Sequence, residues 1–307
     1  MSTPAPGLTG DPQDTIRDVS STRLSPRRPS ELFGFMVVVP PLATFIGFLA
    51  TWMFLTYVIL EPDRRFLLPP PQDVVRVGFL NSAHLTEILR ALASTTGVAL
   101  MGLALAAVTG LTLAVGMSQA QWIERSLYPY AVALQTIPIL ALVPLIGFWF
   151  GFDIRSRVLV CVLIAVFPIV TNTLFGIQSV DRGLHDLFTL HGAGRFTRLC
   201  RLELPAALPA IIAGFRISAG LSVVGAIVGD FFFRQGEPGI GRLIDVYQAR
   251  LQSEQLLAAI FFSSLLGLVV FWAFGMVAQL TVGRWHETRS DTTIRGWRAK
   301  SGRALGT

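Results

Sequence analysis

The chain has 307 residues, of which 52% are hydrophobic and only 14% are charged, and its formal net charge is +6. Soluble domains usually carry about 25% charged residues, so this composition excludes an ordinary soluble domain and indicates a membrane protein. The positive charge does not indicate nucleic-acid binding, because the arginines gather beside the ends of apolar segments.

Six apolar segments each come close to the roughly 20 residues that a helix needs to cross a bilayer. They cover residues 33–60, 91–117, 127–150, 157–178, 207–232 and 256–282. None alternates as the strands of a membrane barrel do, and helices satisfy their own backbone hydrogen bonds in lipid. We therefore expect an all-α membrane protein, with a six-span domain at residues 32–283. The second segment is rich in glycine and alanine, so we expect it inside the bundle.

The two ends of the chain are polar. Residues 1–31 are rich in Pro, Ser, Thr and Asp, a composition typical of a disordered segment, and residues 284–307 form a basic tail. Basic residues are retained on the cytoplasmic side of membrane proteins, so we expect both ends in the cytoplasm, together with the connection at residues 179–206. Arg155 and Arg157, on the predicted outer side, go against this bias.

Prolines fall inside two of the apolar segments: Pro129, Pro138 and Pro144 in the third, and Pro168 in the fourth. A proline within a helix leaves a carbonyl without its usual donor, and in a membrane a neighbouring helix or a wet cavity has to satisfy that carbonyl. Kinked helices of this kind are typical of a translocation path. A simple packing kink explains any single proline equally well.

Polar residues within the apolar segments are candidates for lining such a path. They are Gln135, Thr136, Thr171, Asn172, Arg216 and Asp230. The alternative for the uncharged residues is hydrogen bonding between helices. For Arg216 the favoured alternatives are reaching the inner headgroups or bracing a carbonyl at a helix end. For Asp230 we consider a place in a gate or an ion pair with Arg234.

Neither the cysteines nor the histidines predict a metal site. Cys161 and Cys200 are too few for a disulfide framework, and His185 and His191 lack ligand-forming neighbours at metal spacing. No nucleophile lies beside a base, so we expect no catalytic residues. The chain also lacks a phosphate-binding loop, because Lys300 is its only lysine.

A polar, basic segment at residues 181–205 separates the fourth and fifth apolar segments. Its apolar residues recur at helical spacing, which predicts two short amphipathic helices broken at Gly192-Ala193-Gly194. Pro205 and Pro209 then suit the first turns of the next helix. An ordered polar segment of this length in so apolar a chain predicts a docking site.

This segment resembles the cytoplasmic signature of ABC importer permeases, which reads Glu-Ala-Ala, three residues, Gly, nine residues, Ile-x-Leu-Pro. Here Gly192 is followed after nine residues by Leu202-Glu203-Leu204-Pro205. The Glu-Ala-Ala positions fall on Asp186, Leu187 and Phe188, so the acidity is kept and both alanines are lost.

Other runs, in the same order along the chain, are similar to the permeases for nitrate, sulfonates, taurine and thiamine precursors. They are Gln135-Thr-Ile-Pro138, Pro144-Leu145, Trp149-Phe-Gly-Phe152, Leu204-Pro-Ala-Ala-Leu-Pro209, Gly214-Phe-Arg216, Gly229-Asp-Phe231 and Gly239-Ile-Gly241. The resemblance covers roughly residues 70–282.

The resemblance implies a six-helix type I ABC importer transmembrane domain with a cytoplasmic coupling loop, in a bacterial inner membrane. It implies a non-catalytic permease for a small solute, of the oxyanion, sulfonate or vitamin-precursor class. The implied partners are a dimer of ATPase subunits that binds ATP, a second permease copy or paralogue, and an extracytoplasmic solute-binding protein. The residues implied to contact the ATPase are Asp186, Leu187, Phe188, Gly192, Ala193, Leu204 and Pro205.

The main alternative is a secondary transporter driven by an ion gradient. Such a protein needs acidic residues within its spans or a pair of broken helices related by a repeat, and the sequence has almost none of the first and no clear case of the second. A membrane enzyme or scaffold has no specific feature in its favour.

Overall fold

The computed structural model describes residues 32–286, and within that range every element is a helix. The expectation of an all-α protein is therefore confirmed. The described chain divides at Leu55/Thr56 into two units, each described by itself below. The predicted tails at residues 1–31 and 287–307 lie outside the described range.

The first unit contains the helix α2 (Leu32–Phe54), and a π-helical turn, Leu55–Ile59, follows it. Residues 39–59 are long and apolar enough to cross a membrane. The hydroxyl groups of Thr44 and Thr51 donate to carbonyl oxygens four residues earlier, at 2.9 and 2.8 Å. These polar groups are thus satisfied within the helix, as a lipid-facing span requires.

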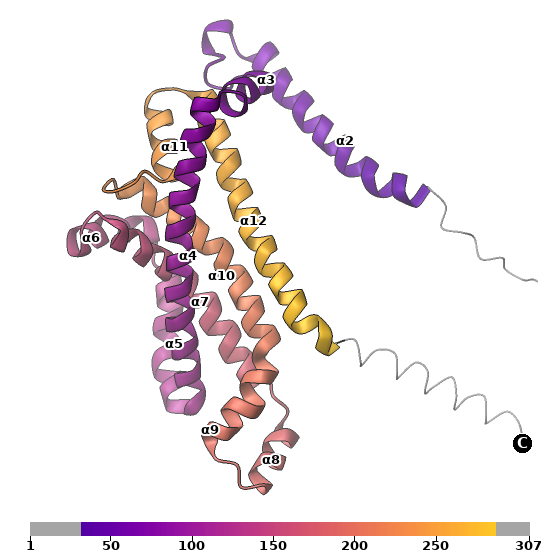
Figure 1. The fold of residues 1–307 in the computed structure, drawn as a ribbon, viewed down its shortest axis with the longest axis vertical. Helices are drawn as coiled ribbons and strands as arrows, with labels where there is room; N and C mark the ends of the chain where they lie inside the picture. The colour runs from indigo at the N-terminus through magenta and orange to yellow at the C-terminus, as the bar shows by residue number, and fades with distance from the viewer. Residues whose placement is uncertain (1–31, 287–307) are drawn as a thin grey trace, which may run out of the picture. The chain divides into compact units, whose positions relative to one another are not determined.

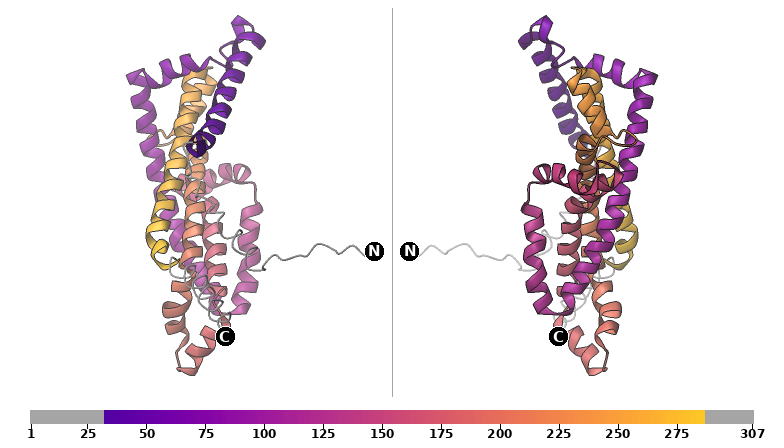
Figure 2. Two further views of the ribbon diagram at one scale, coloured as in Figure 1. Left: turned by 90° about the vertical axis from the view of Figure 1, so that its right-hand side faces the viewer. Right: turned by 90° about the vertical axis from the view of Figure 1, so that its left-hand side faces the viewer.

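The second unit is a bundle of long helices with a short helical projection at one end (Figures 1 and 2). Five helices in the described range, α2 included, can cross a membrane, and a sixth span is obtained if one bent pair is counted as one. The helices of the second unit are α3 (Pro71–Val74), α4 (Ser82–Gln119), α5 (Gln121–Thr136), α6 (Ile139–Phe150), α7 (Ile154–Gln178), α8 (Arg182–Leu190), α9 (Arg195–Arg198), α10 (Leu204–Phe232), α11 (Ile240–Ala249) and α12 (Ser253–His286).

The helix α7 forms the centre of the bundle, with its most extensive contacts to α10 and α4. Glycines make these contacts close: a Cβ on Gly102 of α4 would collide with Cys161 Cβ, and one on Gly225 of α10 would lie 2.8 Å from Cys161 Cα. Ala106 and Ile169 are fully buried in the same core. The predicted packing of the second apolar segment inside the bundle is confirmed for this face of α4.

The third apolar segment does not form the single span that we expected at residues 127–150. The helices α5 and α6 meet at a bend of 101°, between Thr136 and Ile139. Pro138 has no N–H and disfavours helical backbone in the residue before it, and Ile137 accordingly takes ψ of 126°. Pro129 and Pro144 lie inside α5 and α6 and do not end them.

Pro168, in contrast, is accommodated within a continuous α7. Its missing N–H leaves the carbonyl of Ile164 without its usual helical donor. One residue further along, Ser218 Oγ of α10 donates a 2.6 Å hydrogen bond to the Ala165 carbonyl oxygen. This bond reaches the carbonyl next to the freed one, so satisfaction of the Ile164 carbonyl by a neighbouring helix stays a prediction.

Replacing Gly225 by alanine is expected to destabilise the bundle, because the new Cβ would press against the backbone of α7. Overpacking of this kind costs about 1–3 kcal/mol. Gly220 on the same helix has no atom within 4 Å of such a Cβ, so Gly220→Ala is the matched control. Thermal unfolding in detergent measures both variants, and equal midpoints would contradict the close contact.

Candidate functional site

The predicted docking segment at residues 181–205, here called the coupling segment, projects from the end of the bundle where α7 ends and α10 begins (Figure 1). Its helix α8 starts with the Asp181 side chain accepting a 2.7 Å hydrogen bond from Gly183 N–H. It ends at His191, and Gly192 follows with φ of +67°, a backbone conformation that favours glycine. The predicted helix and the break after it are therefore confirmed.

The helix α8 has no buried residue and carries an unpartnered apolar face. Leu184, Leu187 and Leu190 are 45%, 47% and 85% exposed, and Phe196 of α9 is 77% exposed. A groove of about 490 Å³ lies beside this face. It is lined by Leu187, Phe188, His191, Ala193, Thr197 and Arg201.

The base of the coupling segment is fixed to the bundle. Leu199 and Leu202, in the π-helical turn Leu199–Glu203, are buried. His185 Nδ1 of α8 lies 3.9 Å from Glu203 Oε1, which links the exposed helix to the start of α10. The segment is therefore anchored at its base, with its apolar face turned outwards.

The structure divides the predicted ATPase-contacting residues into two groups. Asp186, Leu187, Phe188, Gly192 and Ala193 lie at the exposed tip. Asp186 makes no hydrogen bond or ion pair with any residue in the described range. Leu204 and Pro205 are half-buried in the first turn of α10, where they set its direction rather than offer a surface.

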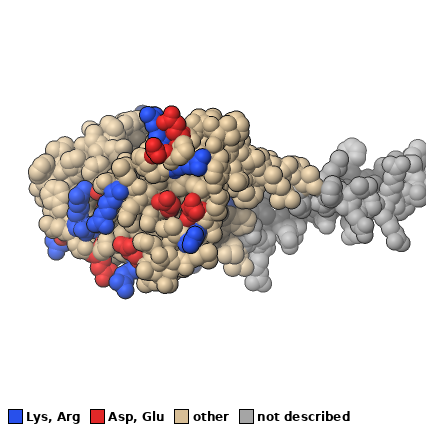
Figure 3. All heavy atoms as spheres, turned by 90° about the horizontal axis from the view of Figure 1, so that it is seen from above, with Lys and Arg blue, Asp and Glu red and all other residues tan. Residues whose placement is uncertain are grey.

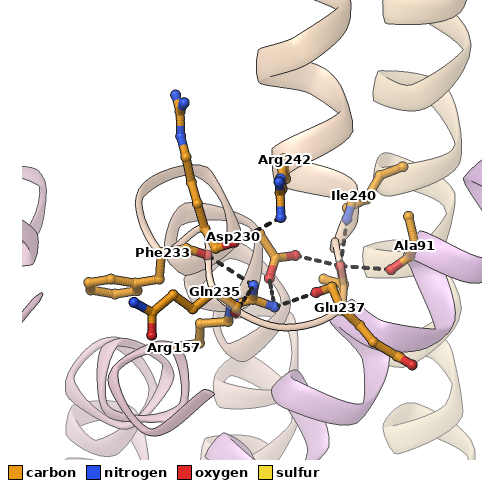
Figure 4. Close-up of polar contacts among 10 residues, drawn as sticks. Ala91, Arg157, Asp230, Phe233, Gln235, Glu237, Ile240 and Arg242 are labelled. Carbon is orange, nitrogen blue, oxygen red and sulfur yellow. Dashed lines mark hydrogen bonds and ion pairs between the residues drawn. The ribbon is translucent and has the colours of Figure 1, made fainter. Parts of the chain in front are cut away.

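A buried polar cluster lies at the opposite end of α7 and α10 (Figure 4). Asp230, near the end of α10, is fully buried, and Arg157, near the start of α7, is 2% exposed. Arg157 Nη1 lies 3.3 Å from Asp230 Oδ1. The same guanidinium donates hydrogen bonds of 2.9 to 3.0 Å to the carbonyl oxygens of Phe233, Gln235 and Glu237.

Thr95 of α4 completes this cluster. Its hydroxyl lies 2.6 Å from Asp230 Oδ2 and accepts a 2.8 Å hydrogen bond from the backbone N–H of Ile240. Gly239 is required here, because a Cβ at this position would overlap the Asp230 carboxylate. The runs Gly229-Asp230-Phe231 and Gly239-Ile240-Gly241, separate in the sequence analysis, therefore form one site.

The expected pairing of Asp230 with Arg234 is wrong. Arg234 is directed away and forms a 2.7 Å ion pair with Asp245 of α11. The partner that we missed is Arg157, which we had noted only as an exception to the charge bias. Its position contained a usable signal: Arg157 starts one apolar segment and Asp230 ends another, so both lie at the same end of neighbouring antiparallel helices.

The other predicted pathway residues are not brought together. Gln135 and Thr136 are exposed at the bend between α5 and α6. Thr171 and Asn172 donate to carbonyl oxygens of their own helix, at 3.0 and 2.8 Å. The Arg216 guanidinium stacks over the ring of Phe271 at 4.1 Å, between α10 and α12.

The helix α11 is also tied to α4 by polar atoms. Tyr247 Oη donates a 3.0 Å hydrogen bond to Glu87 Oε2. Burial, together with this bond to a carboxylate, raises the pKa of the Tyr247 hydroxyl above its usual value.

Acidic and basic side chains are interspersed on the face of the molecule seen from above, at the end opposite α8 (Figure 3). Residues 32–286 hold no cluster of three potential metal ligands.

A family model described as "binding-protein-dependent transport system inner membrane component" matches residues 102–282. The chain belongs to this family. The matched stretch of this ABC importer permease family contains the coupling segment and, apart from Thr95, the buried polar cluster.

Individual relatives agree with this assignment. The chain is 35% identical to the formylaminopyrimidine transport permease protein ThiX of Halalkalibacterium halodurans, over 76% of this chain and 90% of the relative. It is 32% identical to the riboflavin transport system permease protein RibX of Chloroflexus aurantiacus, over 86% and 96%. It is 31% identical to the putative aliphatic sulfonates transport permease protein SsuC of Escherichia coli, over 76% and 87%.

A solved structure supports the fold. The crystal structure of an amino acid ABC transporter with histidines superimposes with a TM-score of 0.52 at 18% identity, covering 68% of this chain and 99% of that chain. The protein is thus a multi-pass inner-membrane permease of an ABC importer for small solutes. The alternative of a secondary transporter is not favoured by these relatives.

Replacing Gly192 by alanine is expected to loosen the tip of the coupling segment, because a residue with a Cβ at positive φ costs about 1–2 kcal/mol. Gly194, two residues on, has φ of −66° and open space around it, so Gly194→Ala is the control. Hydrogen exchange of residues 182–203 should rise in the first variant only. Equal exchange in both variants would contradict the role given to the turn.

Replacing Thr95 by valine is expected to lower the free energy of unfolding by about 1–3 kcal/mol, because Asp230 and the Ile240 N–H lose a buried hydrogen-bond partner. The neighbouring Thr96 hydroxyl bonds only to a carbonyl of its own helix, so Thr96→Val should be close to neutral. Thermal unfolding in detergent compares the two. A larger loss for Thr96→Val would show that the cluster does not hold this end together.

Proposed function

We propose that this protein forms the translocation path of an ATP-driven importer and that its coupling segment docks into a separate ATPase subunit, which binds and hydrolyses ATP. The observation that carries this proposal is the exposed apolar face of α8 beside a groove, on a segment whose base is fixed to α10. An exposed apolar patch on an ordered helix is typical of a protein-interaction site. We place the coupling segment and both chain ends in the cytoplasm, as the charge bias of the sequence favours.

The tip residues take different roles in this proposal. Leu187 and Phe188 line the groove and supply apolar contact area to the ATPase, and Asp186, free of partners in the described range, pairs with a basic group of that subunit. Gly192 and Ala193 are small residues, which let the backbone of the turn approach the ATPase closely. Leu204 and Pro205 transmit the movement, because they join the segment to α10. The permease itself contributes no catalytic group to ATP hydrolysis.

We place the translocation path at the bend between α5 and α6. Non-helical backbone at membrane depth is tolerated only where protein covers it or where it lines a watery cavity. The bend carries the exposed polar residues Gln135 and Thr136, and α5 has no buried residue. A second copy of the chain, or a paralogue, facing this surface would cover it and enclose the path. Arg216 and the pair Thr171 and Asn172 serve helix packing in this arrangement.

The proposed solute is small and belongs to the oxyanion, sulfonate or vitamin-precursor class. Relatives named for formylaminopyrimidine, riboflavin and aliphatic sulfonates support this range. An extracytoplasmic solute-binding protein would deliver the solute to the end opposite α8, where charges of both signs are interspersed (Figure 3). Uptake assays with one member of each class, in cells that express the complete system, would identify the class.

Replacing Leu187 by aspartate is expected to abolish co-purification of the ATPase and ATP-driven uptake, because a charge would replace part of the apolar contact surface. The matched control is Leu80→Asp, since Leu80 is also exposed (74%) and lies outside the coupling segment. Affinity purification of the tagged permease measures the association. Retention of the ATPase by Leu187→Asp, or uptake by vesicles without any ATPase, would overturn the proposal.

A further inference from the structure

The connection between α10 and α11 is held mainly through its backbone. Residues 234–238 are exposed, and Gly236 in their middle has φ of +89°. The guanidinium of Arg157 donates hydrogen bonds to the carbonyl oxygens of Phe233, Gln235 and Glu237. A further backbone hydrogen bond of 3.2 Å joins Gln235 N–H to the Phe152 carbonyl at the start of the turn before α7. Arg157 thus holds three carbonyl oxygens of this connection, and Arg242 Nη1 holds a fourth, that of Arg234, at 2.8 Å.

The three helices beneath this connection are held together by close backbone packing. The helices α4, α7 and α10 approach each other at glycines, so that Cβ atoms on Gly102, Gly225 or Gly229 would press against α7. Such close contacts have no room for sliding. By contrast, a pocket of about 300 Å³ remains at the seam between α4 and α11, lined by Ala83, Thr86, Glu87, Arg90, Ala91, Pro238 and Leu243. Glu87, which lines this pocket, also accepts the hydrogen bond from Tyr247 of α11, so opening at this seam has to break that bond as well.

We propose that Arg157, Asp230 and Thr95 form a latch, which holds residues 233–240 and the start of α11 against the three packed helices and has to release in each transport cycle. This inference rests on the proposed function. Transport requires one end of the path to open while the other closes. The latch lies at the far ends of α7 and α10, the two helices that the coupling segment joins. It is thus positioned to respond when that segment is moved.

The alternative is a static brace, which also predicts loss of stability when the cluster is mutated. A reversible cross-link distinguishes a latch that releases from a static brace. Thr95 Oγ1 lies 2.8 Å from Ile240 N, so the side chain of residue 95 reaches the backbone of residue 240. The double variant Thr95→Cys/Ile240→Cys is made in a Cys161→Ala/Cys200→Ala background, since these are the two native cysteines. The complete importer, with its ATPase and binding protein, is reconstituted in vesicles and oxidised with copper phenanthroline.

The latch predicts that oxidation reduces ATP-driven uptake to the level of vesicles without permease and that dithiothreitol restores it. The ATPase should co-purify before and after oxidation, and oxidation should leave the uptake of each single-cysteine variant at the level of its own reduced form. Undiminished uptake by the fully cross-linked protein would establish a static brace and overturn the inference. If neither oxidation nor the shortest bis-methanethiosulfonate reagent links the two residues, the latch geometry itself is wrong.

The same experiment separates this inference from the proposed function. If the reduced double variant carries solute only when the ATPase and ATP are present, the proposed function stands, whatever the effect of oxidation. If the reduced protein carries solute without the ATPase, the proposed function fails. The effect of the cross-link would then show only whether this end opens in a transporter that is not driven by ATP.

Discussion

The contact of α7 with α4 and α10 holds both ends of this protein in a fixed relation. Lipid gives helices no hydrophobic reason to associate, so association depends on close packing and on polar contacts between them. Gly102 and Gly225 provide the first, since they bring two backbones onto opposite sides of Cys161. Ser218 provides the second through its bond to the Ala165 carbonyl. With this core fixed, α7 and α10 behave as one body.

That body connects two very different surfaces. At one end it carries the coupling segment, whose apolar side chains point outwards and lack a partner in the described range. At the other end it carries Arg157 and Asp230, which are almost completely buried and lie 3.3 Å apart, while the guanidinium also donates to a stretch of backbone. A buried ion pair contributes little net stability, because desolvation of both charges offsets their attraction. A small net stability agrees with the proposed latch, in which this contact breaks and forms again.

The bend between α5 and α6 gives the bundle an open side. One proline, Pro138, ends the first helix, and the change of direction leaves α5 without a buried residue. Large exposed aromatic residues follow on α6, among them Phe148 (76% exposed) and Trp149 (68% exposed). An amphipathic surface of this kind, with polar atoms at the bend, is unsuited to lipid alone. The proposed second permease would complete the path on this surface.

The sequence by itself determined the helical class, the number and order of the apolar segments, and the position and turn of the coupling segment. These features depend on local composition and spacing, as the positions of Gly192 and Pro205 illustrate. Only the tertiary structure decided which of three prolines breaks the third segment, and that Asp230 pairs with Arg157 rather than with the nearby Arg234. The pairing of Asp230 depends on residues far apart in the chain, because Arg157 can hold the buried carboxylate and several carbonyl oxygens at once, and no local pattern records that choice.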